Sequence, residues 1–95
     1  MPHFVYIMAS RPGGALYIGR TADLRQRVEQ HRSGKGGLHT AKYRIDRLIW
    51  FEAHEEFEVS LLRERRIKRW RRSWKDHLIM ETNPQWRDVT GEVPY

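Results

Sequence analysis

The sequence contains no cysteine and no long apolar run. Without Cys among its 95 residues, the chain can form neither a disulfide framework nor a thiolate metal site. No apolar stretch approaches the ~18 residues that a membrane-spanning helix needs, and the N-terminal residues lack the charged and apolar regions of a secretory signal. We therefore expect a soluble protein of the cytoplasm.

Acidic residues are few relative to basic ones. The chain has 18 Lys and Arg against 12 Asp and Glu, a formal net charge of +6, and 14 of the basic residues are arginines. A guanidinium binds phosphate through two parallel hydrogen bonds, so an arginine-rich surface favours an anionic polymer as partner. The composition indicates DNA or RNA, and the alternative is a basic surface that is only solvated.

Three short runs of aromatic and β-branched residues predict the strands of one small domain, residues 1–95. They lie at 3–8, 15–19 and 47–53. Turn residues at 11–14 join the first two strands into a hairpin. The third strand is mostly apolar, which predicts burial on both of its faces.

Helices are predicted at residues 22–32, 56–74 and 75–81. Thr21 is the expected N-cap of the first helix, because its hydroxyl can accept a hydrogen bond from a free backbone N–H. Residues 33–40 contain three glycines and are expected to form a mobile, basic loop.

The C-terminal part is expected to hold little regular structure. Asn83-Pro84 ends the last helix, because a residue before proline is disfavoured in the α conformation, and the tail from Thr90 is expected to be loosely held. The order β-β-α-β-α-α predicts an α+β domain in which helices flank a three-stranded sheet, since a bare small sheet cannot bury enough apolar area.

Two tyrosines, Tyr6 and Tyr17, lie in the two strands of the predicted hairpin. Aromatic residues are common in strands, so each alone is typical of a core or its rim. An arginine-rich helix follows directly in the sequence. Two phenols on paired strands beside cations indicate a site that cuts phosphodiesters.

The first predicted helix carries polar residues on its apolar stripe. Leu24, Val28 and His31 are spaced at i, i+4 and i+7, and Arg27 falls on the same side. Burying Arg and His costs desolvation energy unless both find partners. We expect Arg27 and His31 to border a polar cavity with Arg20 nearby; the alternative is a rotated helix on which Arg27 is solvated.

Glu64 is the only acidic residue between positions 63 and 75, where eight residues are basic. One interpretation is an i, i+4 salt bridge to Lys68, worth about 0.3–0.5 kcal/mol. The other is a carboxylate that holds a divalent cation such as Mg²⁺, which prefers oxygen ligands. The basic face around Glu64 is either solvated or tracks a phosphate backbone.

The four tryptophans are expected mainly in the core, because a chain this short needs their buried area. They are Trp50, Trp70, Trp74 and Trp86. Base stacking by Trp70 or Trp74 is the less favoured alternative. The remaining histidines show no zinc-like spacing, and no Walker-type phosphate loop is present.

Taken together, these residues resemble the GIY-YIG nuclease superfamily, most closely its small stand-alone bacterial (YhbQ-like) group. The resemblance spans about residues 4–89. The segments that carry it are Phe4-Val5-Tyr6, Tyr17-Ile18-Gly19, the helix signature at 23–31, the carboxylate motif at 63–70 and the terminal motif at 83–88. Phe4 and Val5 replace the usual Gly-Ile, which we interpret as a packing change, and Arg20 stands where several members have Lys.

The resemblance implies a mainly antiparallel sheet and metal-dependent hydrolysis of phosphodiester bonds in DNA, in repair or in the processing of structured DNA. Tyr6 would be the general base or would position the attacking water. Arg27 would clamp the phosphate, and Glu64 would hold one Mg²⁺ or Mn²⁺. Tyr17 and His31 would orient the reacting groups, and Asn83 would bind the phosphate or buttress the site. Further contacts to nucleic acid are expected from Arg20, Lys42, Arg66, Arg69 and Arg72.

Two other functions remain open from the sequence. The first is a catalytically weak or inactive GIY-YIG domain that binds DNA or RNA through the basic face between residues 63 and 75. The second is a small basic protein with a protein partner. DNA is favoured over RNA, and the oligomeric state is left open.

Overall fold

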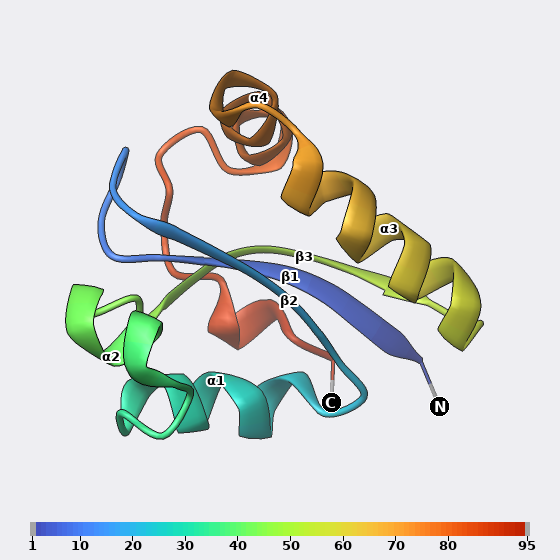
Figure 1. Cartoon of the computed structure of the whole chain (residues 1–95), viewed down its shortest axis with the longest axis horizontal. Coiled ribbons are helices and arrows are strands. Elements are labelled where there is room, and N and C mark those ends of the chain that lie inside the picture. Colours follow the sequence, from blue (N-terminus) through green and yellow to red (C-terminus); the bar gives the residue numbers. More distant parts are fainter. Residues whose placement is uncertain (1, 95) are drawn as a thin grey trace.

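A three-stranded antiparallel sheet forms the centre of the protein in the computed structural model, which describes residues 2–94 except the side chain of His39 (Figure 1). Its strands are β1 (His3–Ala9), β2 (Leu16–Thr21) and β3 (Arg47–His54), in the spatial order β2-β1-β3. Both neighbours pair antiparallel with β1. The predicted sheet and the element order of an α+β domain are thus confirmed.

The central strand β1 is buried on both faces because helices cover the sheet on each side. Phe4, Tyr6 and Met8 pack in one core cluster with residues of α1 (Leu24–Arg32) and of the C-terminal segment. Val5 and Ile7 pack in the other, with residues of the two later helices. Figure 1 shows α3 and α4 on one side of the sheet and α1 on the other.

The first helix begins two residues later than expected. Its N-cap is Asp23, whose carboxylate accepts a hydrogen bond from the Gln26 N–H at 3.1 Å. Thr21 instead accepts a hydrogen bond from the Asp23 N–H at 3.0 Å. The prediction of Thr21 as the N-cap is wrong, because Asp23 directly precedes the helix and its negative charge is favoured next to the free N–H groups of the first turn.

The segment predicted as a mobile loop contains part of a short helix, α2 (Leu38–Tyr43). Two buried residues, Thr40 and Ile45, hold this segment against the body of the protein. The prediction of a loop over residues 33–40 is therefore wrong at its C-terminal end. Local composition favoured a loop, and tertiary packing overrode it.

The two helices predicted at 56–74 and 75–81 are present as α3 (Phe57–Arg69) and α4 (Arg72–Thr82), but the break between them lies earlier than predicted. The chain turns at Trp70 and Arg71, which both adopt extended backbone angles, with ψ of 148° and 158°. Ile67 on α3 and Ile79 on α4 then reach the same core cluster. Asn83 ends α4 as expected.

No helix within residues 2–94 is long and apolar enough to cross a membrane.

The C-terminal tail is held against the sheet rather than loose. Thr90–Glu92 forms a 3₁₀ turn, and Val93, which is 3% exposed, joins the core cluster that contains Tyr6. Arg25 on α1 donates a hydrogen bond to the Val93 carbonyl at 2.7 Å. The expectation of a loose tail is wrong because Val89 and Val93 complete the core under α1.

The tryptophans divide between core and surface. Trp50 and Trp86 are buried as predicted, and Trp70 is half-buried at the end of α3. Trp74 is 53% exposed, so its assignment to the core is wrong. Trp74 lies in the first turn of α4, after the break between the two helices, and its ring meets that of Trp70 with centroids 6.1 Å apart.

Candidate active site

Tyr6 lies at the centre of the candidate site, in the middle of β1. Gly19 stands opposite it on β2, and a Cβ atom at Gly19 would lie 2.5 Å from the Tyr6 Oη. Such a contact is too short for any side chain, so glycine at this position allows the phenol to lie over the neighbouring strand. The Tyr-Ile-Gly motif of β2 therefore has a steric function next to Tyr6.

Two residues of α1 bind the Tyr6 hydroxyl. Arg27 donates a hydrogen bond from Nε to the Tyr6 Oη at 3.2 Å. The His31 Nε2 lies 3.1 Å from the same oxygen. The one-turn spacing of these two residues on α1 brings both to one phenol, so Arg27 is a partner of Tyr6 rather than a solvated residue.

The ionisation of the cluster follows from its burial. Burial raises the pKa of Tyr6 to about 12, against the opposing effect of the Arg27 hydrogen bond. Burial also lowers the pKa of His31 to about 4, and the positive charge of Arg27 acts in the same direction. The hydrogen bond to Tyr6 raises the pKa of Arg27. Near neutral pH the cluster therefore consists of a neutral phenol, a neutral imidazole and a guanidinium cation.

These charge states assign the protons. Arg27 is the donor to the Tyr6 oxygen, so the phenolic proton points to the His31 Nε2, which accepts it. The His31 Nδ1 then carries the single N–H proton of the neutral imidazole, and this nitrogen is buried without a hydrogen-bond partner among the described residues. A Cβ at Gly36 would lie 2.4 Å from this Nδ1, so the glycine allows the loop before α2 to pass over the ring.

Tyr17 completes the aromatic part of the cluster. Its ring lies edge-on to the His31 ring with centroids 4.9 Å apart, and its centroid is 6.2 Å from that of Tyr6. Tyr17 is half-buried, whereas Tyr6 is fully buried. The two tyrosines thus differ in their access to solvent, and Tyr17 forms the outer edge of the cluster.

Glu64 on α3 acts electrostatically on this cluster, since its negative charge is among the causes that raise the pKa of Tyr6. Its carboxylate is 15% exposed, and Oε2 pairs with the Lys68 Nζ at 3.0 Å. The salt bridge of the simpler interpretation is therefore present. Oε1 has no hydrogen bond to the described residues, which leaves one hard oxygen donor of Glu64 free to bind a cation.

A divalent cation fits this donor set only as a mainly hydrated ion. No group of three His, Asp or Glu residues that could hold a metal exists within residues 2–94. Mg²⁺ commonly binds through one or two carboxylates and keeps several waters. The single carboxylate of Glu64 fits this mode of Mg²⁺ binding. It does not supply the several protein ligands that a zinc site needs.

The residues expected to contact phosphate are dispersed. Arg20 packs over the Phe57 ring at 4.4 Å, and Lys42 lies on α2 over the Tyr43 ring at 5.5 Å. Arg72 donates to the Gly14 carbonyl at 2.6 Å and pairs with Asp76 at 2.7 Å. Through these contacts Arg72 holds α4 against the hairpin turn. The remaining two, Arg66 and Arg69, are exposed on α3.

Asn83 lies apart from the tyrosine cluster, at the end of α4. Its Nδ2 donates to the carbonyls of Ile49 and Arg87, at 2.9 and 2.8 Å, and its Oδ1 accepts from the Arg87 N–H at 3.0 Å. The side chain is 3% exposed. All of its hydrogen-bonding groups are used by the backbone, which favours buttressing over phosphate binding.

Replacing Asn83 with alanine is expected to destabilise the fold by about 2–4 kcal/mol, because three backbone groups lose their partner at a buried position. Urea denaturation measures the loss. Thr82→Ala, at the exposed neighbouring position, is the control and should cost far less. An Asn83→Ala protein of normal stability and impaired cleavage would instead give Asn83 a role at the substrate.

Two residues of the site were missed from the sequence. Gln30 accepts a hydrogen bond from the Arg27 Nη1 at 3.0 Å and so fixes the guanidinium. Its spacing of three residues from Arg27 on one helix was an available signal. Gly36, which packs on His31, had no signal beyond its place in a glycine-rich segment.

Comparisons with known proteins agree with this geometry. The GIY-YIG catalytic domain family matches residues 2–77. UPF0213 proteins of Staphylococcus aureus strains Mu3 and N315 are each 39% identical to the chain over 79 residues, which is 83% of this chain and 95% of theirs. The solution NMR structure of a UPF0213 protein from Bacillus halodurans is 30% identical, with a TM-score of 0.59 over 95% of both chains.

The match to the catalytic domain covers both tyrosine motifs, the Arg27 and His31 helix and Glu64. The name UPF0213 specifies no activity, so the relatives add the fold and the family. The domain is of nuclease type, and the chain belongs to the GIY-YIG family.

Proposed function

We propose that this protein is a divalent-metal-dependent endonuclease that hydrolyses phosphodiester bonds in DNA. The observation that carries the proposal is the buried phenol of Tyr6, bound by Arg27 and His31 and subject to the charge of Glu64. A core tyrosine needs one hydrogen-bond partner. A cation, a neutral imidazole and a carboxylate around one phenol supply the groups of a hydrolytic site.

The phenol and the imidazole would move the proton of the attacking water. Tyr6 alone is a poor base, because its pKa of about 12 keeps it protonated at neutral pH. Its proton, however, already points to the neutral His31 Nε2 at 3.1 Å. As water approaches the Tyr6 oxygen, the phenol would pass its own proton to His31 and take one from the water.

Substrate binding would open the site to water. Tyr6 has no exposed surface, whereas Arg27 and Tyr17 beside it are partly exposed. A phosphate attracts the Arg27 guanidinium, and movement of Arg27 toward it uncovers the Tyr6 oxygen. Arg27 would then stabilise the charge that develops on the phosphate in the transition state.

Glu64 would hold the cation, Mg²⁺ or Mn²⁺, with water and phosphate oxygens as its other ligands. The cation supplies Lewis-acid stabilisation of the leaving 3′ oxygen. Glu64 can serve without a large rearrangement, because Oε1 has no hydrogen bond to the described residues and Oε2 is paired only with Lys68, whose side chain is half exposed.

The test is cleavage by the purified protein. Supercoiled plasmid and a branched DNA substrate are incubated with Mg²⁺, with Mn²⁺ and with EDTA. We expect nicking that requires the divalent cation. Absence of cleavage on every substrate, with DNA binding retained, would favour the second candidate.

That second candidate is a catalytically weak GIY-YIG domain that binds DNA or RNA. Two observations favour it: the high pKa of Tyr6, and the replacement of Gly-Ile by Phe4-Val5 in the first motif. Phe4 and Val5 are fully buried in the two opposite core clusters. Their burial supports a packing change away from the Tyr6 hydroxyl, so we favour the endonuclease.

A further inference from the structure

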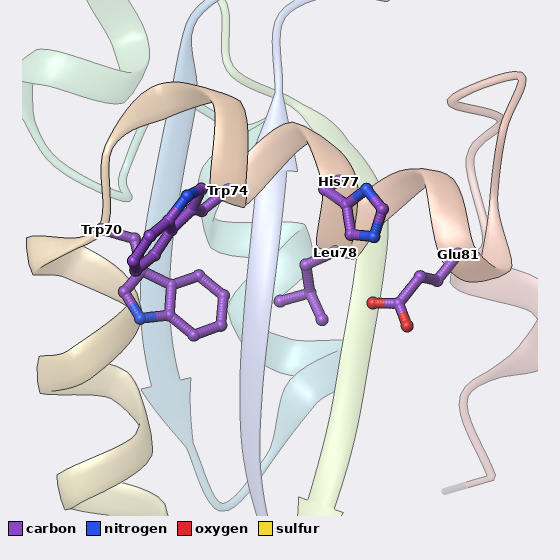
Figure 2. Close-up of a pocket in the computed structure, with 5 residues that line it drawn as sticks. All are labelled: Trp70, Trp74, His77, Leu78 and Glu81. Atoms are coloured by element: carbon purple, nitrogen blue, oxygen red, sulfur yellow. The ribbon is translucent and has the colours of Figure 1, made fainter.

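An apolar pocket lies outside the tyrosine cluster, where α3 meets α4. It has a volume of about 210 Å³ and is lined by Trp70, Trp74, His77, Leu78 and Glu81. Figure 2 shows these side chains in a row along α4, with the two indoles at one end and Glu81 at the other. No part of the proposed hydrolysis uses this pocket.

The two indoles form a corner suited to a flat ring. The rings of Trp70 and Trp74 are 6.1 Å apart and nearly perpendicular, at 77°. A planar ligand can stack on one indole and meet the edge of the other, which are the two favourable arrangements of aromatic pairs. Trp74 belongs to neither core cluster and exposes half of its surface, so packing alone does not account for it.

The charges around the pocket favour an anionic ligand. The guanidinium of Arg63 lies over Trp70 at 5.4 Å and that of Arg71 over Trp74 at 5.0 Å. Within the part of the chain that the structure describes, five cations of α3, α4 and the turn between them have no ion pair: Arg65, Arg66, Arg69, Arg71 and Lys75. Exposed indoles combined with free cations are typical of surfaces that bind single-stranded nucleic acid by base stacking.

The pocket is connected to the proposed metal ligand through α3. Trp70 follows this helix directly and stands six residues after Glu64, a rise of about 9 Å along the helix axis. We propose that the Trp70–Trp74 pocket binds an unpaired nucleobase of the DNA substrate. This inference rests on the proposed function for the identity of the ligand as DNA, and it specifies a substrate with a single-stranded segment.

Binding is measured with the full chain in EDTA, so that metal-dependent cleavage does not contribute. Fluorescence anisotropy compares a blunt DNA duplex with the same duplex carrying a single-stranded 3′ extension. Trp74→Ala should weaken binding of the extended duplex by about 5- to 140-fold, the range for loss of one stacked base. Binding of the blunt duplex should remain unchanged.

Two variants control for surface and ring effects. Leu62→Ala is the matched control. Leu62 on α3 is an apolar residue that is 52% exposed, close to the 53% exposure of Trp74, and it does not line the pocket. It should leave both affinities unchanged. Trp74→Phe keeps a ring that can stack on a base, so it should lose less affinity for the extended duplex than Trp74→Ala.

The inference is overturned if Trp74→Ala leaves the affinity for the extended duplex unchanged or weakens both duplexes equally. It is also overturned if the wild type binds no DNA, or if gel filtration shows a dimer that Trp74→Ala dissociates, since the pocket then binds a second copy. Cleavage with Mg²⁺ is measured separately. If the protein cleaves DNA but Trp74→Ala has no effect on binding, only nucleobase binding at the pocket is rejected. If Trp74→Ala weakens binding as expected but the protein does not cleave DNA, only the nuclease activity is rejected.

Discussion

Replacing Glu64 with glutamine is expected to lower the rate of Mg²⁺-dependent cleavage by about 10³-fold. Loss of the cation removes several kcal/mol of transition-state stabilisation, and each 1.36 kcal/mol is a factor of ten in rate. The substitution keeps the size of the side chain and removes its charge. The measurement is single-turnover cleavage of labelled DNA over a range of Mg²⁺ concentrations.

Two features make the Glu64→Gln result specific. The fold should be retained, because the pair with Lys68 is a helical i, i+4 salt bridge worth about 0.3–0.5 kcal/mol. The negative charge of Glu64 also contributes to the raised pKa of Tyr6, so its removal makes the phenol easier to ionise. Lost activity therefore reports on the cation and not on Tyr6.

The matched control is Glu58→Gln, a second carboxylate on α3, which is exposed and in no ion pair among the described residues. It should cleave at the wild-type rate. If Glu64→Gln cleaves as fast as this control, the assignment of the metal to Glu64 is wrong.

Replacing Arg27 with alanine should lower the rate of the chemical step by about 10²–10³-fold, the usual cost of removing one donor that stabilises charge in the transition state. Arg27→Lys should recover only part of this loss. Lysine retains the charge, but it lacks the planar group that lets arginine bind Tyr6 and Gln30 at the same time. Single-turnover rates at saturating DNA separate this effect from binding.

Arg25→Ala is the control for charge, because Arg25 lies on the same helix and binds the Val93 carbonyl instead of Tyr6. We expect a small loss of stability and a normal rate per folded molecule. Equal losses of rate in Arg25→Ala and Arg27→Ala would show that α1 contributes only a general positive charge, and the clamp at Arg27 would be rejected.

The strands and the tyrosine cluster were largely predictable from local chemistry. Aromatic and β-branched runs on either side of a Gly-Pro turn specify a hairpin wherever they occur. The position of Arg27 and His31 on the apolar stripe of α1 signalled partners for both, because burying them without partners is costly. The Tyr6 hydroxyl accepts a hydrogen bond from Arg27 and donates one to His31.

A break between two helices was predicted after residue 74, but its actual position at Trp70 and Arg71 was not predictable in this way. Trp70 and Arg71 are neither glycine nor proline, so propensity continues the helix through them. The chain turns there because Ile67 and Ile79 must both reach the same face of a short sheet. That turn exposes Trp74 and creates the pocket, so a feature assigned to the core from composition became a surface site.

The sequence by itself determined the family, the order of the elements and the residue types at the candidate site, because these depend on motifs and on local periodicity. Only the tertiary structure decided how those residues are used. The register of β1 against β2 sets Gly19 under the Tyr6 hydroxyl. At the C-terminal end of α4, the Asn83 side chain forms hydrogen bonds with backbone groups of Ile49 and Arg87. Both outcomes depend on contacts between segments distant in sequence, where packing and hydrogen-bond satisfaction outweigh local preference.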